Sequence, residues 1–109
     1  SRMNTEPRLS VLLPCRDVED TIDDAIASLL PQTFEAFEIV AVDDGSGDNT
    51  VHLLKNWAES DSRIRLLQPP PQGIVAALNL AVDHRLINGR TAAQFLTKVQ
   101  EIMESGMFD

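Results

Sequence analysis

Two adjacent aspartates, Asp43 and Asp44, end an apolar run that begins at Phe37. Like charges side by side are costly without a partner, so this pair indicates a ligand-binding site. Carboxylate oxygens can accept hydrogen bonds from a nucleobase N–H or from ribose hydroxyls. The next residues, 45–50, are Gly, Ser, Gly, Asp, Asn and Thr, which an ordinary turn and helix cap also require. We therefore interpret the glycines, Ser46 and Asp48 as turn residues and only the aspartate pair as evidence for a site.

The elements that must position this pair alternate along the chain. Short apolar runs bounded by turn residues predict strands, and apolar residues at helical spacing predict helices. The expected order is strand 9–14, helix 18–30, strand 37–42, helix 49–60, strand 63–67 and helix 74–82. Strands that alternate with helices imply right-handed crossovers and a parallel sheet. The sequence therefore predicts an α/β, Rossmann-like parallel sheet with flanking helices.

Ligands of open parallel sheets bind outside the carboxyl ends of the strands, where the strand order switches. Three segments are expected to converge at that edge: residues 14–17, residues 43–46, and the loop that ends at Gly73. Arg16 in the first segment could stack on a base or bridge phosphates. A nucleotide is therefore a candidate ligand.

The C-terminal part of the chain has a different character. No fourth strand is expected after Val82, and the mixed polar residues 83–90 are interpreted as a junction at which a segment is missing. Thr91 and Gln94 form a capping box, which predicts an amphipathic helix from Thr91 to Ser105. Its apolar stripe would pack in a core or form an interface, and an interface would make the protein a homo-oligomer.

Composition narrows the class of ligand. Asp and Glu number 17 against 9 Lys and Arg, and the formal net charge is −8. Such a chain repels nucleic acid and anionic membrane surfaces, and a bound nucleotide would need a cation to neutralise its phosphates. The single cysteine excludes an intramolecular disulfide and fits a reducing, cytoplasmic location. No apolar stretch reaches the roughly 20 residues of a membrane span, so no membrane segment is expected.

The motifs "LSVLLP", "VDDGS", "DNT" and "GIVAALN" occur in an order and spacing that closely resembles the N-terminal half of family 2 glycosyltransferases with the GT-A fold. The resemblance covers residues 9–82. It implies sugar transfer with inversion from a nucleotide-diphosphate sugar, usually with Mn²⁺ or Mg²⁺. A UDP-sugar is the favoured donor, GDP or dTDP are alternatives, and the sugar, lipid or protein acceptor is open.

The resemblance also implies roles for individual residues. By analogy, Asp44 hydrogen-bonds the base, Asp43 supports the site, and residues 14–16 flank the base and ribose. The expected nucleotide-binding residues are Pro14, Cys15, Arg16, Asp43, Asp44, Gly73 and Asn79. The implied organisation is a tag or N-terminal tail (1–8), a nucleotide-sugar-binding half (9–82), the junction (83–90) and a C-terminal helix (91–109).

The chain departs from the family pattern in several places. Arg16 stands where an aromatic residue is common, and Leu78 stands where an arginine often precedes the asparagine. The sequence contains no Asp-x-Asp metal motif and no matching catalytic base, so the catalytic residues stay unassigned and the chain alone is expected to be inactive. Two other interpretations stay open: a truncated or degenerate non-catalytic module, and a receiver-type signalling domain, whose acidic pair would follow the first strand instead.

Overall fold

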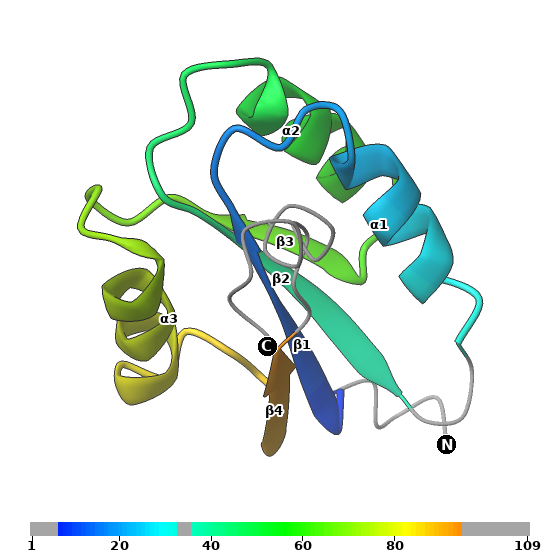
Figure 1. Cartoon of the computed structure of the whole chain (residues 1–109). Helices are drawn as coiled ribbons and strands as arrows, with labels where there is room; N and C mark the ends of the chain where they lie inside the picture. Colours follow the sequence, from blue (N-terminus) through cyan, green and yellow to red (C-terminus); the bar gives the residue numbers. More distant parts are fainter. Residues whose placement is uncertain (1–6, 33–35, 95–109) are drawn as a thin grey trace, which may run out of the picture.

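The computed structural model describes residues 7–32 and 36–94 as a four-stranded sheet with flanking helices (Figure 1). The elements in chain order are β1 (Leu9–Cys15), α1 (Ile22–Leu29), β2 (Phe37–Asp43), α2 (Thr50–Ser60), β3 (Ile64–Leu67), α3 (Ile74–Asp83) and β4 (Thr91–Gln94). The strands lie in the order β3-β2-β1-β4, and every neighbouring pair is parallel. The predicted parallel α/β class is thus confirmed, with boundaries shifted by a few residues at most.

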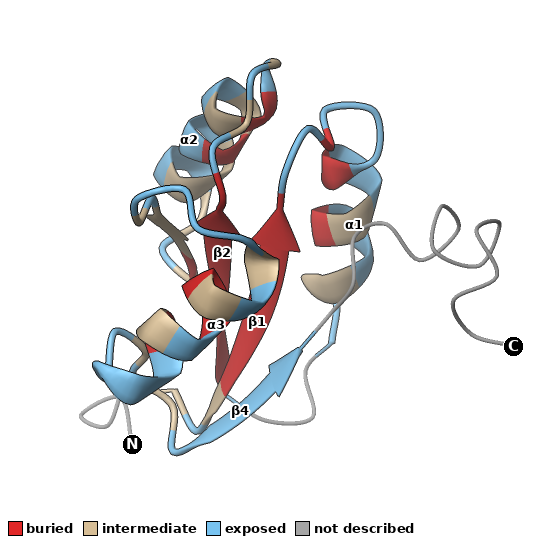
Figure 2. Ribbon diagram, turned by 60° about the vertical axis from the view of Figure 1, so that its left-hand side comes forward, coloured by how far each residue is buried: buried red, intermediate tan, exposed pale blue. Residues whose placement is uncertain are grey.

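Helices cover both faces of the sheet (Figure 2). Side chains alternate between the faces along a strand, so β1 and β2 feed two separate cores. The core under α1 and α2 includes Val11, Leu13, Ile22, Ile26, Ile39, Ala41 and Leu54. The core under α3 includes Leu12, Val40, Val42, Ala77, Leu78 and Ala81. Every residue of β2 is buried, which explains why the apolar residues Ile39 to Val42 run without alternation.

The C-terminal end of the described chain differs from the prediction. Thr91–Gln94 is not the first turn of a helix but the strand β4, which pairs in parallel with β1 from Leu9↔Thr91 to Leu12↔Gln94. The expectation that no fourth strand follows α3 was therefore also wrong. All four side chains of β4 are exposed, so what defines this strand is its backbone pairing with the free edge of β1. The remainder of the predicted helix, 95–105, lies outside the described residues.

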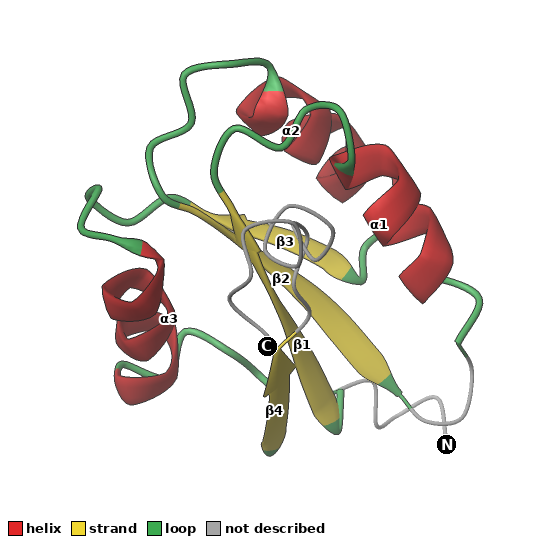
Figure 3. Ribbon diagram, in the orientation of Figure 1, coloured by secondary structure: helices red, strands yellow, loops and turns green. Residues whose placement is uncertain are grey.

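The connection from α3 to β4, drawn as a loop in Figure 3, is fastened to the sheet by a buried carboxylate. Glu38 is 4% exposed, and its carboxylate accepts hydrogen bonds from Ser10 Oγ (2.6 Å), the Asn88 N–H (2.6 Å) and Arg65 Nη1 (2.9 Å). The Gly89 N–H donates to Ser10 Oγ at 2.7 Å. We call these five residues the Glu38 anchor. It lies at the amino end of the sheet, because Ser10, Glu38 and Arg65 are each the second residue of a strand.

The Glu38 anchor favours an ionised glutamate. Burial on its own would raise the pKa of Glu38. The hydrogen bonds from Ser10, Asn88 and Arg65, together with the Arg65 charge, outweigh burial and hold the pKa of Glu38 below its ordinary value. Asn88 and Gly89, within the predicted junction 83–90, are thus tied to the same sheet as the rest of the fold.

Candidate functional site

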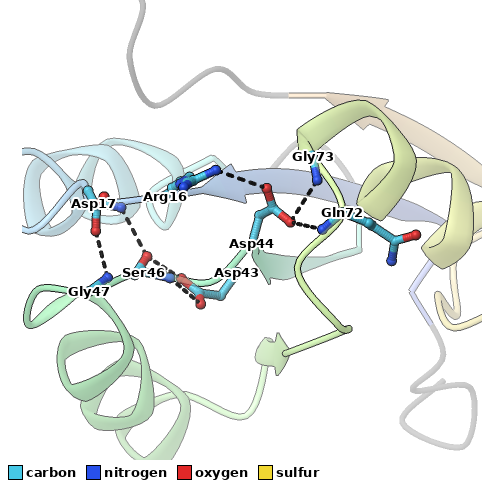
Figure 4. Close-up of polar contacts among 8 residues, drawn as sticks. All are labelled: Arg16, Asp17, Asp43, Asp44, Ser46, Gly47, Gln72 and Gly73. Atoms are coloured by element: carbon cyan, nitrogen blue, oxygen red, sulfur yellow. Dashed lines mark hydrogen bonds and ion pairs between the residues drawn. The ribbon is translucent and has the colours of Figure 1, made fainter.

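Three loops meet at the carboxyl edge of the sheet (Figure 4). They follow β1 and β2 and precede α3, as the sequence predicted. The Asp44 N–H donates to the Cys15 carbonyl oxygen at 2.9 Å, which extends the pairing of β2 with β1 by one residue. The strand order reverses across β1, whose neighbours are β2 and β4. The aspartate pair therefore lies beside the reversal, at the end of β2, rather than at the β1–β4 crevice itself.

Asp43 holds the loops together. Its Oδ1 accepts a hydrogen bond from Ser46 Oγ (2.5 Å), and its Oδ2 accepts one from the Ser46 N–H (3.1 Å). Ser46 Oγ in turn accepts the Asp17 N–H (3.0 Å), and Asp17 Oδ1 accepts the Gly47 N–H (2.7 Å). This chain of bonds joins the loop after β1 to the loop after β2. Both Asp43 oxygens are occupied, so its geometry suits the supporting role that the resemblance implied.

Asp44 is held differently. It is 1% exposed, and its Oδ1 accepts two backbone N–H groups, from Gln72 (2.9 Å) and Gly73 (3.2 Å). Its Oδ2 is buried and accepts no hydrogen bond from the described residues. Arg16 Nη1 lies 3.8 Å from Oδ2, a distance that gives an ion pair but is too long for a hydrogen bond. A buried carboxylate oxygen without a hydrogen bond is costly and rare, so it indicates a ligand contact.

Two glycines shape the backbone around Asp44. Gly45 (φ +78°) and Gly73 (φ +96°) have positive φ values, which glycine adopts without steric cost. A Cβ on Gly45 would lie 3.0 Å from Pro71 Cγ, so the proline loop packs closely on the residue after Asp44. The loop that ends at Gly73 is therefore a wall of the site.

Pro14 and Cys15, two further predicted nucleotide-binding residues, are buried. Pro14 is buried in β1 opposite Val42. The Cys15 side chain is fully buried and donates to the Leu13 carbonyl at 3.3 Å. Burial, followed by the charge of Asp43, raises the pKa of the Cys15 thiol to about 12, so it stays protonated. Cys15 reaches the site through its backbone carbonyl alone.

On α3, Asn79 is exposed while its neighbour Leu78 is buried against the sheet. The position at which the family often carries an arginine is thus a core position in this chain. Sequence reasoning missed the contributions of Asp17, which bonds the neighbouring loop, and of Gln72, which binds Asp44 through its backbone. A backbone contact leaves no residue-type signal, so Gln72 could not have been found from the sequence.

The described residues do not form a complete metal site by themselves. Within residues 7–32 and 36–94, no three His, Cys, Asp or Glu side chains come together as a metal-binding group. Each Asp43 oxygen accepts one hydrogen bond from Ser46, and Asp44 Oδ2 accepts none from the described residues. Mg²⁺ is usually held by one or two carboxylates together with waters and substrate phosphates, so the aspartate pair could supply at most part of its coordination. In this same part of the chain, no helix is long and apolar enough to cross a membrane.

Comparison with known sequences identifies a family. The protein-family model described as glycosyl transferase family 2 matches residues 10–85. The uncharacterized glycosyltransferase YibD of Escherichia coli (strain K12) is 36% identical over 81 residues, which is 74% of this chain and 24% of that protein. The uncharacterized glycosyltransferase EpsJ of Bacillus subtilis (strain 168) is 34% identical over 76 residues, 70% of this chain and 22% of that protein. The chain spans about a quarter of the length of these relatives.

Solved structures show the same fold. The mannosyltransferase PcManGT from Pyrobaculum calidifontis, in complex with GDP-Man and Mn²⁺, is 27% identical with a TM-score of 0.61, over 72% of this chain and 24% of that one. S. aureus TarS 1-349 in complex with UDP-GlcNAc is 21% identical with a TM-score of 0.67, over 90% of this chain and 30% of that one. At that identity, the likeness to TarS shows the fold alone.

A second family model, described as the catalytic domain of 2-oxoacid dehydrogenases acyltransferase, matches residues 71–107. It covers about a third of the chain and overlaps the first match over residues 71–85, so it shows no second family membership. In the structure, α3 within this overlap packs on β1 and β2 as part of the same sheet domain. The match over residues 10–85 covers well over half of the chain, and the chain therefore belongs to glycosyl transferase family 2.

Proposed function

We propose that this chain forms the donor-nucleotide site of an inverting glycosyltransferase, which transfers a sugar from a nucleotide-diphosphate sugar to an acceptor hydroxyl. The observation that carries the proposal is Asp44, a buried carboxylate at the sheet edge with one oxygen that no described residue bonds. The related mannosyltransferase in complex with GDP-Man supports a nucleotide sugar as the ligand. It also contains Mn²⁺, whereas the described residues of this chain lack a fitting metal site.

The described residues would bind and orient the nucleotide. Asp44 Oδ2 accepts an N–H of the base, and Arg16, 59% exposed, is free to contact the base or the phosphates. Asp43 holds Ser46 by two hydrogen bonds, and Ser46 joins the loop after β2 to the loop after β1 by accepting the Asp17 N–H. Pro14 and the Cys15 backbone form the floor beside the base, and Asn79 supplies an exposed amide on α3.

Inversion requires the acceptor hydroxyl to attack the anomeric carbon on the face opposite the departing nucleoside diphosphate. A carboxylate that takes the hydroxyl proton in this step acts as general base. We assign neither that base nor a metal ligand to the described residues, because Asp43 is bonded to Ser46, Asp44 is assigned to the nucleotide, and no metal-binding group occurs in residues 7–32 and 36–94. The 109-residue chain is therefore expected to bind nucleotide without transferring sugar.

Titration calorimetry with UDP and GDP, each with Mn²⁺, tests the proposal on the 109-residue chain. We expect saturable binding that weakens by at least about tenfold in Asp44→Ala, since a hydrogen bond to a charged group is lost. Asp24→Asn is the control, because Asp24 is an exposed acidic residue on α1 and its loss removes the same charge. Absence of binding, or equal weakening in both variants, would contradict the proposal.

A non-catalytic nucleotide-binding module is the second candidate. It is favoured by the missing metal cluster among residues 7–32 and 36–94. The two candidates differ in an assay of the product of the complete coding sequence, incubated with UDP-sugars and Mn²⁺. Release of UDP identifies an enzyme, whereas binding without release identifies a module.

A further inference from the structure

A groove lies between α1 and α2, the two helices that cover one face of the sheet (Figure 1). Its volume is about 490 Å³, which is within the usual size range of ligand pockets. Its lining combines apolar side chains with polar ones, namely Ala27, Leu53 and Trp57 with Asp23, Asn56 and Ser60. None of these residues belongs to the nucleotide site at the carboxyl edge of the sheet.

The indole of Trp57 is held in one orientation at this groove. Its Nε1–H donates a hydrogen bond to Asp23 Oδ1 at 2.7 Å, which joins α2 to α1. The Trp57 side chain is half-buried, because it packs against the core beneath the two helices and also lines the groove. A ring whose position is already fixed loses little conformational entropy when a ligand packs on it. Trp57 and Asp23 together therefore form a rigid aromatic platform.

Polar groups beside this platform are available to a ligand. Asp23 Oδ2 and the Asn56 side-chain amide make no hydrogen bond to any described residue. Ser60 Oγ donates to the Trp57 carbonyl oxygen at 2.9 Å and keeps its capacity to accept. A carboxylate oxygen accepts, whereas an amide both accepts and donates. The groove thus offers acceptors and donors at the edge of an aromatic surface.

A pyranose sugar matches this combination of groups. One face of its ring carries C–H groups, which pack on an aromatic ring and are attracted to the negative face of the π system. Its rim carries hydroxyls, each of which donates and accepts hydrogen bonds. An anionic sugar is disfavoured, because Asp23 places a negative charge at the groove and the whole chain has a net charge of −8. The ligand class that fits is a neutral saccharide.

We infer that the groove between α1 and α2 is a carbohydrate-binding site, separate from the nucleotide site, in which a neutral saccharide packs on Trp57 and its hydroxyls bond Asp23 and Asn56. A basic peptide is the other class that suits an aromatic ring beside a carboxylate. The choice of a saccharide over a peptide rests on the proposed function, because a sugar acceptor has parts that do not react and that such a groove can hold.

Trp57 itself provides the readout, because the sequence contains one tryptophan and no tyrosine. The experiment titrates the 109-residue chain with maltose, lactose and N,N′-diacetylchitobiose and follows the fluorescence of Trp57. We expect a saturable change with at least one of these neutral disaccharides, at millimolar concentrations.

Two substitutions of Asp23 test how the saccharide is bound. Asp23→Ala removes the acceptor of the indole N–H together with Oδ2, so we expect the affinity to fall at least about fivefold. Asp23→Asn keeps an oxygen for the indole N–H, and its NH₂ can donate to a hydroxyl, so the affinity should stay within about twofold. Asp83→Ala is the control, because Asp83 is an exposed acidic residue on α3, which covers the other face of the sheet (Figure 2).

The absence of a fluorescence change with all the disaccharides would overturn the inference, as would equal weakening in Asp23→Ala and Asp83→Ala. Saturable binding of pentalysine that Asp23→Asn abolishes, without saccharide binding, would identify a peptide groove and overturn it as well. Asp23→Asn keeps the inference testable even if Asp23→Ala fails to fold. These outcomes leave the binding of UDP untouched, whereas a chain that binds a disaccharide but no UDP or GDP would contradict the proposed function alone.

Discussion

Two buried carboxylates lie at opposite ends of one strand and differ in how many of their oxygens accept hydrogen bonds. Glu38, the second residue of β2, is 4% exposed, and Asp44, which follows β2, is 1% exposed. Both Glu38 oxygens accept hydrogen bonds, from Ser10, Arg65 and Asn88. Asp44 has one occupied oxygen and one without a hydrogen-bond partner among the described residues. Burial is common to both, so burial alone does not mark the site.

The difference separates a structural carboxylate from a binding carboxylate. A buried polar group whose bonds are all made stabilises one arrangement of the chain. A buried oxygen left without a partner costs stability in the free protein, and that cost is recovered when a ligand supplies the missing donor. The amino end of the sheet is therefore closed by the Glu38 anchor, whereas the carboxyl end is open at Asp44.

The largest expected effect is the difference in stability between two variants, each of which lacks one of the two carboxylates. Glu38→Ala leaves Ser10, the Asn88 N–H and Arg65 without their acceptor, so we expect a loss of about 2–4 kcal/mol in the free energy of unfolding. Asp44→Ala releases two N–H groups of the exposed residues Gln72 and Gly73, which water can reach, and should cost about 1 kcal/mol or less. Urea unfolding measures both. Equal losses would contradict the assignment of Glu38 as a structural carboxylate and Asp44 as a binding carboxylate.

A smaller effect is expected from the glycine of the Glu38 anchor. A Cβ on Gly89 would lie 2.6 Å from the backbone N and from Oγ of Ser10, so Gly89→Ala must push the connection away from β1. Such overpacking costs typically about 1–3 kcal/mol. Gly47→Ala is the matched control at the open end, because its Cβ would meet nothing closer than Asp17 Oδ1 at 4.0 Å. A control as unstable as Gly89→Ala would contradict the close packing of the anchor.

The smallest effect concerns pH. The pKa of Glu38 is lower in the folded chain than its ordinary value of 4.5, so folding favours the ionised form. Its contribution to stability is complete above pH 4.5 and is lost as the pH falls through the lowered folded-state pKa. Urea unfolding in steps below pH 4.5 should show a shallower decline in Glu38→Gln than in the unaltered chain. An identical decline in both would show that Glu38 is not the titrating group.

The sequence predicted what depends on local pattern. The helices and first three strands follow from apolar spacing, and the convergence of Arg16, Asp44 and Gly73 follows from a parallel sheet, whose carboxyl ends share one edge. It could not predict β4, because Thr91–Gln94 has exposed side chains and is a strand only through its pairing with β1. It also missed the Glu38 anchor, in which Gly89 bonds Ser10 across 79 positions of sequence.

The most direct test of the open and closed ends is an amide NMR titration of the chain with UDP. We expect the largest shifts at the amides of Arg16, Asp44, Gln72 and Gly73, while the amides of Glu38, Asn88 and Gly89 do not shift. Saturating shifts centred on the Glu38 anchor, or none at Gln72 and Gly73, would contradict the claim that Asp44 is the binding carboxylate.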